Sequence, residues 1–292
     1  MIALVTGVNG LLGKDIAKVM FEKGSCKVIG TGRAECKNLD IDYVKIDLTD
    51  TSRLEQLLTD IEPDIIIHCA AYTKLDDCEK DNEYAYRMNV EVTRYLAEHA
   101  KRFVYISSDA VFSGKTGNYK ENDNSDAINY YGYTKYMGEK AAEVCENHLI
   151  IRSSIYGYNL NDNQSIAEWG IRSLRDGKAI NGFKDVIFNP LYSVQLADIL
   201  LRMIQKECTG VYHLGSEQVV SKYEFFKLCA REIGAEENLV NPTSVDEIDF
   251  IAKRTKDTSL CVDKACEYMD GQNDILGGIS QMVQDMKHGH RI

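Results

Sequence analysis

The 292-residue chain contains no long apolar run and no paired cysteine motif. A membrane-spanning helix needs roughly 20 consecutive apolar residues, and no segment approaches that length. The amino-terminal segment MIALVTG has no basic flank of the kind that begins a secretory signal. The nine cysteines include no Cys-x-x-Cys spacing, which argues against zinc ligands and a disulfide framework. We therefore expect a cytoplasmic protein with free thiols, no bound metal and no membrane partner.

Basic residues are too few to balance the acidic ones. The chain has 34 Lys and Arg against 45 Asp and Glu, for a net charge of −11. Proteins that bind nucleic acid need basic surface to displace counterions, so we expect no nucleic-acid partner. A local basic pocket for a phosphorylated small molecule is compatible with this charge. Hydrophobic residues make up 44% of the chain, which is typical of a folded protein of one large or two modest domains.

A glycine-rich turn lies between the first predicted strand and the first predicted helix. Residues 2–7, IALVTG, form a short apolar run of the kind found in buried parallel strands. Glycines follow at positions 7, 10 and 13, and the helical pattern after them ends at Gly24. Small residues let the backbone approach a phosphate, and a helix N-terminus offers unpaired N–H groups to an anion. The spacing G-x-x-G-x-x-G is not the commonest dinucleotide fingerprint, so a glycine turn before an ordinary packed helix stays an alternative at this point.

Strand and helix patterns continue to alternate through the first half of the chain. The further predicted strands cover residues 27–33, 43–50, 63–71 and 102–108. This alternation predicts an α/β fold with a Rossmann-type doubly wound parallel sheet, in which ligands bind outside the carboxyl ends of the strands. The residues expected at that edge are Gly7, Arg33, Asp47, Ala70 and Ser108. The alternation breaks down in the carboxyl-terminal half, which predicts a smaller α/β substrate lobe.

The end of the second predicted strand bears on the choice of cofactor. NAD sites usually carry a carboxylate there for the adenosine ribose, whereas a basic residue suits the 2′-phosphate of NADP. This chain has Thr31, Gly32 and Arg33 at that place. NADP(H) is therefore favoured, and NAD(H) stays open because Arg33 can equally stack on adenine from the surface.

Tyrosine and lysine recur four residues apart. The pairs are Tyr131/Lys135, Tyr136/Lys140 and Tyr223/Lys227. A carbonyl reductase must give a proton to an oxygen while hydride reaches the carbon, and a tyrosine does this when a nearby cation stabilises the phenolate. A lysine one helical turn later supplies that charge, and a hydroxyl from a strand end can bind the same oxygen. The spacing is too common by chance to select one pair by itself.

An ordered set of segments resembles the extended short-chain dehydrogenase/reductase superfamily, and within it the dTDP-4-dehydrorhamnose reductase family. The segments are TGVNGLLG (6–13), AAYTKLDDCEKD (70–81), AYRMNV (85–90), YISSDAVFSG (105–114), YYGYTKYMGE (130–139), IIRSSIYG (150–157), NPLYSVQLAD (189–198), GVYHLG (210–215) and AKRTKDTSL (252–260). Each segment is common alone, but the ordered set is specific and spans nearly the whole chain.

The resemblance implies that Ser108, Tyr131 and Lys135 are the catalytic residues, because the family pattern Tyr-Gly-x-Ser/Thr-Lys falls on residues 131–135. In that family Tyr131 would donate the proton and Ser108 would hold the keto oxygen. Lys135 would bind the nicotinamide ribose and lower the pKa of the tyrosine. Tyr136 lies about 100° around the helix from Lys135, so we expect it to pack elsewhere. Tyr223 belongs to an amphipathic helix, where we expect a packing role.

The resemblance also implies two sets of binding residues. The cofactor residues are Gly7, Asn9, Gly10, Leu11, Leu12, Gly13, Arg33, Asp47, Leu48, Ala70, Ala71, Tyr72 and Asn89, together with Tyr131 and Lys135. The substrate residues are Ser108, Asp109, Val111, Phe112, Ile155 and Arg254, and Arg152, Arg172 and Arg175 are further candidates for a diphosphate. The chain departs from the family pattern at Ala110, Ile155 and Thr255, which leaves the particular sugar open.

The implied activity is NADPH-dependent reduction of a nucleotide-activated 4-keto sugar. Dehydratases of the superfamily carry Asp-Glu after the hydroxyl residue, and Asp109-Ala110 here argues against elimination. A non-catalytic NADP-binding regulatory subunit, like that of methionine adenosyltransferase, and a sugar-nucleotide epimerase stay open as alternatives. By the resemblance, the nucleotide domain covers 1–156 and about 187–214, and the substrate lobe about 157–186 and 215–292. The oligomeric state is also open, with a homodimer as one expectation.

Overall fold

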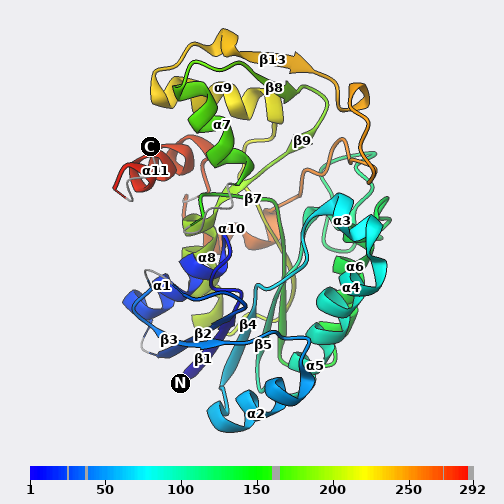
Figure 1. Ribbon diagram of the computed structural model, residues 1–292, viewed down its shortest axis with the longest axis vertical. Coiled ribbons are helices and arrows are strands. Elements are labelled where there is room, and N and C mark those ends of the chain that lie inside the picture. The colour runs from blue at the N-terminus through cyan, green and yellow to red at the C-terminus, as the bar shows by residue number, and fades with distance from the viewer. Residues whose placement is uncertain (25, 37–38, 160–164, 272, 289–292) are drawn as a thin grey trace.

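A seven-stranded sheet forms the centre of the fold in the computed structural model, which describes residues 1–24, 26–36, 39–159, 165–271 and 273–288 (Figure 1). In spatial order its strands are β11 (Gly210–Leu214), β6 (His148–Ser153), β5 (Phe103–Ile106), β4 (Ile65–His68), β1 (Ile2–Thr6), β2 (Lys27–Gly32) and β3 (Asp42–Lys45). Every neighbouring pair is parallel. The chain order reverses between β1 and β4, which is where doubly wound sheets bind their ligands. The predicted Rossmann-type fold is confirmed.

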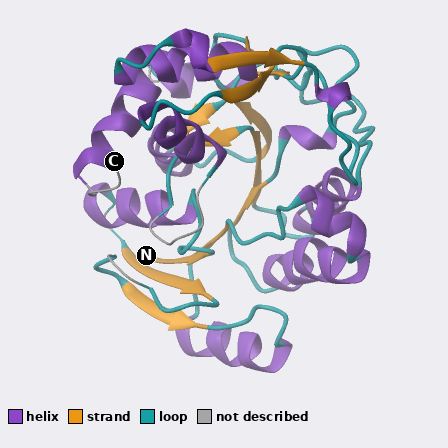
Figure 2. Ribbon diagram, turned by 45° about the horizontal axis from the view of Figure 1, so that its top comes forward, coloured by secondary structure: helices purple, strands orange, loops and turns teal. Residues whose placement is uncertain are grey.

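Helices cover both faces of this sheet (Figure 2). One face carries α1 (Gly13–Lys23) and α8 (Ser193–Gln205), and the other carries α2 (Thr51–Ile61), α5 (Val92–Glu98) and α6 (Tyr130–Ala142). Successive residues of a strand point to opposite faces, so both must be apolar. In β1, Ala3 and Val5 pack toward the first helix pair, and Leu4 packs toward the other three helices. This explains why the strand reads as a continuous apolar run.

Short helices occupy the connections near the carboxyl edge of the sheet. They are α3 (Leu75–Lys80), α4 (Asn82–Tyr86), the π-helix η1 (Arg87–Glu91) and the 3-10 helix η2 (Asp109–Val111). The π-helix runs directly into α5, and such wide turns are often found at functional sites. The connection after β4 therefore carries more irregular structure than a simple strand-to-helix loop.

A second, smaller group of elements lies above the sheet in Figure 1 and has its own apolar core. It contains β7 (Ile155–Tyr156), α7 (Ile166–Arg175), β8 (Ile180–Phe183), β9 (Ile187–Phe188), β10 (Leu191–Tyr192), β12 (Val220–Ser221), α9 (Lys222–Ile233), η3 (Glu237–Leu239), β13 (Val240–Thr243), η4 (Val245–Glu247) and α11 (Ile275–His288). The strands here form only two-stranded sheets. Most of these elements fall in the ranges expected for the substrate lobe, whereas β7, β9 and β10 lie in the ranges expected for the nucleotide domain.

The division into a nucleotide domain and a lobe stays a prediction, and the packing bears on its limits. β11 joins the central sheet, in agreement with the expected return of the chain to the first domain. The segment with η5 (Asp263–Ala265) and α10 (Cys266–Met269) was assigned to the lobe, yet Ala265 and Met269 belong to the core of the central sheet. Residues 160–164, 272 and 289–292 of the predicted lobe lie outside the described residues.

The helices are short in comparison with a bilayer. Among the described residues, no helix is both long and apolar enough to cross a membrane.

Candidate active site

The turn after β1 contains glycines, so its backbone carries few side chains at the carboxyl edge of the sheet. Gly7 has φ +72°, a left-handed conformation that favours glycine, and its N–H donates to the Thr31 carbonyl at 2.9 Å. A Cβ on Gly7 would lie 2.8 Å from the Ala70 nitrogen, and one on Gly13 would lie 2.3 Å from the Gly7 oxygen. Larger residues would therefore force apart the turns after β1 and β4. Gly10 between them is exposed, so its backbone beside the start of α1 is accessible from solvent.

The loop after β2 lies beside this turn. The Asn9 side chain donates to the Ala34 carbonyl at 2.9 Å and to the Tyr43 hydroxyl at 3.2 Å. Arg33 is exposed, and its guanidinium donates to the Tyr84 hydroxyl at 2.7 Å. Arg33 thus lies at the carboxyl end of β2, where its cation is accessible from solvent.

Asp47 and Leu48 follow β3 at the same edge. Desolvation alone would raise the pKa of Asp47, but hydrogen bonds from Thr49 and the charges of Arg33 and Arg87 hold it below the ordinary value. Leu48 is only 4% exposed and packs in the core. Of the two, Asp47 has the more accessible side chain for a ligand.

Asn89 uses its side chain to join two parts of the protein. Its amide oxygen accepts from the Tyr72 N–H at 2.8 Å, and its amide nitrogen donates to the Tyr72 carbonyl at 3.0 Å. The same nitrogen donates to the Thr134 hydroxyl of α6 at 2.9 Å. The residue is 1% exposed, so it fixes the loop of residues 70–72 against α6 and has little surface left for direct contact with a cofactor.

Ser108, Tyr131 and Lys135 come together at the ends of β5 and α6. Ser108 follows β5 and donates its hydroxyl to the Asp109 carboxylate at 3.0 Å. Tyr131 lies in the first turn of α6, which starts where it does because the Asn129 side chain accepts from the Gly132 N–H at 2.8 Å. Burial raises the pKa of Tyr131, and a hydrogen bond with Ser108 opposes that shift. A substrate oxygen bound here would meet two hydroxyl groups.

The ammonium of Lys135 points into the protein from one turn further along α6. Its Nζ donates to the Ile106 carbonyl at 2.7 Å and lies 4.1 Å from the centroid of the Tyr105 ring. Burial lowers the pKa of Lys135 to about 7, and Glu139 opposes this shift. The resemblance implies a lowered pKa for Tyr131. In the structure the pKa of Tyr131 is raised instead, because the side chain is buried.

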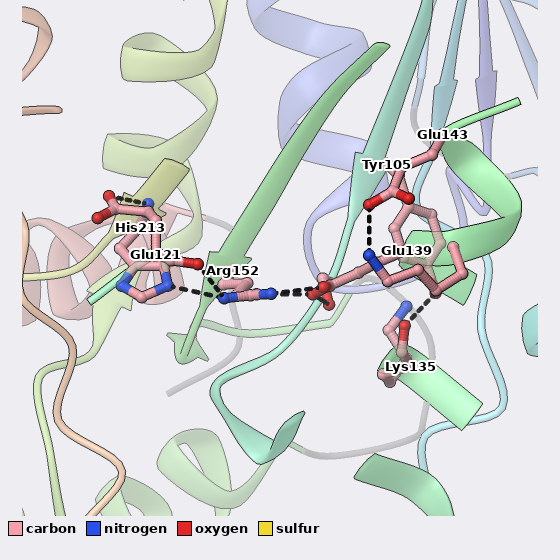
Figure 3. Close-up of polar contacts among 9 residues, drawn as sticks. Tyr105, Glu121, Lys135, Glu139, Glu143, Arg152 and His213 are labelled. Atoms are coloured by element: carbon pink, nitrogen blue, oxygen red, sulfur yellow. Dashed lines mark hydrogen bonds and ion pairs between the residues drawn. The ribbon is translucent and has the colours of Figure 1, made fainter. Parts of the chain in front are cut away.

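A buried ionic network lies behind Lys135 and was not predicted from the sequence (Figure 3). The Glu139 carboxylate accepts two bonds from Arg152 of β6, at 2.8 and 2.7 Å, and one from the Ser107 hydroxyl at 2.6 Å. On its other side, Arg152 lies 3.4 Å from Nε2 of His213 on β11. Glu139 is 1% exposed and Arg152 is 5% exposed. The network therefore ties α6 to β6, to β11 and to the residue that follows β5, and it leaves Arg152 little surface for a substrate diphosphate.

Asp109 connects the candidate catalytic residues to a strap of residues 253–260. The Thr258 hydroxyl donates to the Asp109 carboxylate at 2.7 Å, and the Thr258 N–H donates to the Ile187 carbonyl of β9 at 3.0 Å. The strap is also held at its start, because the Asn129 side chain donates to the Lys253 carbonyl at 3.0 Å. Burial raises the pKa of Asp109, and hydrogen bonds from Thr258 and Ser108 oppose the rise. The strap of residues 253–260 thus contacts the residue next to the candidate catalytic Ser108.

The other predicted substrate residues divide into accessible and inaccessible side chains. Val111 and Phe112 are fully buried, with the Phe112 ring stacked on Tyr119 at 4.2 Å, so they support the loop and do not face a ligand. Ile155 is partly exposed on β7, beside the sheet edge. Arg254 is also partly exposed, and its guanidinium forms an ion pair with Asp76 at 2.9 Å.

A comparison with known proteins places the chain in a family. Residues 1–286 match the family described as RmlD substrate binding domain. The chain belongs to this family. The match spans both the central sheet and the smaller lobe, and it confirms the resemblance to dTDP-4-dehydrorhamnose reductases within the extended short-chain dehydrogenase/reductase superfamily.

Individual relatives of the RmlD family agree with this assignment. The "Probable low-salt glycan biosynthesis reductase Agl14" of Haloferax volcanii is 31% identical over 271 residues, which are 90% of this chain and 90% of that protein. The "Methionine adenosyltransferase 2 subunit beta" of Pongo abelii is 37% identical over 241 residues, 76% of this chain and 69% of that protein. A crystal structure of dTDP-4-dehydrorhamnose reductase from Bacillus anthracis in complex with NADP has 29% identity and a TM-score of 0.82, covering 97% of this chain and 99% of that one.

Within the RmlD family pattern, the two remaining Tyr-x-x-x-Lys pairs take packing positions. Tyr136 packs beside the cluster of Val111, Phe112 and Tyr119, and the exposed Lys140 lies 5.5 Å from its ring centroid. Tyr223 packs against the lobe core, and Lys227 forms an ion pair with Glu237 at 2.9 Å. The expected packing of both tyrosines is confirmed.

Metal ligands do not gather at this site. Within the described ranges, no group of three or more His, Cys, Asp or Glu side chains is arranged to hold a metal ion.

Proposed function

We propose that this protein is an NADPH-dependent reductase of a nucleotide-activated 4-keto sugar. The observation that carries the proposal is the meeting of Ser108, Tyr131 and Lys135 at the sheet edge, beside a glycine turn whose backbone is accessible from solvent. Two relatives support it: the Haloferax volcanii protein is named a glycan biosynthesis reductase, and the Bacillus anthracis reductase was crystallised with NADP.

The residues of this chain divide the work of reduction. When bound, NADPH supplies the hydride for the keto carbon. Tyr131 gives its phenolic proton to the keto oxygen, and the Ser108 hydroxyl binds the same oxygen. The raised pKa of Tyr131 keeps the phenol protonated before the reaction, so the proton is available. Lys135 donates one N–H to Ile106, which leaves other N–H groups for the ribose hydroxyls of the cofactor.

The cofactor residues follow the sheet edge in the proposed complex. Gly7, Gly10 and Gly13 would lie against the pyrophosphate, with Leu11 and Leu12 opening α1. Arg33 would bind the 2′-phosphate, so NADPH is preferred and NADH is a weaker alternative. Ala70, Ala71 and Tyr72 would lie along the nicotinamide side, held there by Asn89.

The test is a screen of NADPH oxidation against a panel of 4-keto nucleotide sugars, with dTDP-4-dehydrorhamnose among them. We expect turnover with at least one member of the panel. Tight NADP binding without turnover of any member would contradict the proposal.

A regulatory subunit is the second candidate, because of the 37% identity to methionine adenosyltransferase 2 subunit beta. In that case the site binds NADP without reducing a sugar, and the protein associates with a partner enzyme. The same screen separates the two candidates, since a binding-only protein shows cofactor affinity and no substrate-dependent oxidation.

A further inference from the structure

Lys222 is a cation whose ammonium has no partner in the structure. Among the described residues its Nζ has neither a hydrogen bond nor an ion pair, and its one ring contact is at 6.0 Å from the Phe188 centroid. Lys222 was not predicted as a site residue. It is the first residue of α9, whose start is marked by a capping box of Ser221 and Glu224. The residue is partly buried, so part of its surface is open to an entering group.

Three of the other cations proposed for a substrate anion already form ion pairs within the protein. Arg152 is buried against Glu139, and Arg172 forms an ion pair with Glu168 at 3.0 Å. Arg254 forms its ion pair with Asp76. Each of these three guanidinium groups is thus paired with a carboxylate, Arg175 is exposed, and the Lys222 ammonium is paired with no carboxylate among the described residues.

A short chain of contacts leads from Lys222 to the reaction centre. The Lys222 N–H donates to the Val186 carbonyl at 2.9 Å, and β12, which ends just before it, pairs with β9. The next contact runs from Ile187 of β9 to Thr258, and Thr258 donates to Asp109. Asp109 is the neighbour of Ser108 in sequence, so these contacts connect the backbone of Lys222 to the segment that carries Ser108.

The charges agree with this placement. Burial lowers the pKa of Lys222; the negative charge of Asp109 opposes the shift and the positive charge of Arg254 adds to it. In turn, Lys222 lowers the pKa of Asp109, though less than the hydrogen bonds from Thr258 and Ser108 do. The charges of Asp109 and Lys222 thus shift each other's pKa, but the two side chains form no ion pair. An anionic group that enters between the lobe and the sheet would meet an unpaired ammonium.

We propose that Lys222 binds an anionic oxygen of the substrate and thereby helps to decide which nucleotide sugar is accepted. The proposal rests on the proposed function, because it needs a nucleotide sugar in the site. The oxygen belongs either to the diphosphate or to a carboxylate on the sugar, and both are strong acceptors for an ammonium.

The test is calorimetric binding of two probes, dTDP-glucose and dTDP-glucuronate, to the NADP-saturated protein and its variants. If the diphosphate is the partner, Lys222→Met weakens both probes equally, by about 10- to 100-fold. If a sugar carboxylate is the partner, only dTDP-glucuronate loses affinity. Lys222→Arg should keep most of the affinity in either case. The matched control is Lys227→Met, which removes a lysine from the same helix and should leave both affinities unchanged.

Unchanged affinity of Lys222→Met for both probes would overturn the proposal. The affinity for NADP reports whether each variant is folded, since Lys222 lies on the lobe and not on the glycine turn. Failure of the proposed function has another signature: the wild-type protein itself would bind NADP and neither probe, which would also refute the role of Lys222.

Discussion

The carboxylate of Glu139 and the guanidinium of Arg152 form a two-bond ion pair, at 2.8 and 2.7 Å, directly behind the candidate catalytic lysine. Glu139 lies one helical turn after Lys135 on α6, and Arg152 lies on β6 (Figure 3). The pair holds the helix that carries Tyr131 and Lys135 against the strands. It also places a negative charge near Lys135, which raises the pKa of the lysine against the effect of burial.

Glu139→Gln should strongly destabilise the protein, because it leaves the Arg152 charge buried without a counterion. Breaking a buried ion pair costs about 3–5 kcal/mol in the free energy of unfolding. Urea denaturation measures the loss, and Glu139→Gln combined with Arg152→Met should recover part of it. The control is Glu143→Gln, which breaks the exposed pair with Lys140 and should have little effect. A similarly small loss from Glu139→Gln would contradict this account of the network.

The buried ammonium of Lys135 should make stability depend on pH in a defined direction. Its pKa is about 7 in the folded protein, whereas the value in an unfolded chain is about 10.4. Between these values the unfolded state binds more protons at this site, so stability rises with pH by up to about 1.4 kcal/mol per pH unit. Lys135→Met removes this dependence.

Urea denaturation of the wild type and Lys135→Met at pH 7, 8 and 9 measures this pH dependence of stability. The unfolding free energy of the wild type minus that of the variant should increase with pH, because groups that do not interact with Lys135 cancel in the difference. A difference that is constant across this range would mean that Lys135 is not desolvated as the structure indicates.

Arg33→Ala should raise the KM for NADPH more than the KM for NADH. Arg33 is exposed at the carboxyl end of β2, so its loss should not disturb the fold, and only NADPH carries the 2′-phosphate. Because one charge-assisted contact is lost, the KM for NADPH should rise about tenfold or more relative to the KM for NADH. The matched control is Lys27→Ala, an exposed cation at the opposite end of the same strand. Equal changes for the two cofactors would remove the assigned role of Arg33.

The fold follows from local patterns in the sequence, whereas the choice among the tyrosines needed the ordered family segments. Adjacent residues are enough to predict a buried parallel strand and the glycine turn after it, as in IALVTG before Gly10 and Gly13. The packing of Tyr136 follows in the same way, because residues on one helix have a fixed angular relation. Such features need no knowledge of distant contacts.

The features that escaped prediction depend on residues far apart in the chain. The Asp76 partner of Arg254 is a contact between α3 and the strap of residues 253–260. The position of Lys222 depends on the pairing of β9 with β12 and on the same strap. The Glu139 and Arg152 pair joins a helix to a strand, and neither side chain differs in sequence from an ordinary surface charge. Phe112 was expected to contact the substrate, but it is buried in a cluster with Tyr119 and Leu260. The sequence does not show this burial, because Leu260 is far from the other two residues in the chain.

The central claim is that Tyr131 is the proton donor of a reductase, and one comparison tests it most directly. The measurement is NADPH-dependent reduction of a 4-keto nucleotide sugar by the wild type, Tyr131→Phe and Tyr136→Phe, with the Kd for NADP determined on the same preparations. We expect Tyr131→Phe to lower kcat by about 10²- to 10⁴-fold with nearly unchanged NADP affinity. Tyr136→Phe should stay close to wild type. Undiminished turnover by Tyr131→Phe, or an equal loss in Tyr136→Phe, would contradict the assignment.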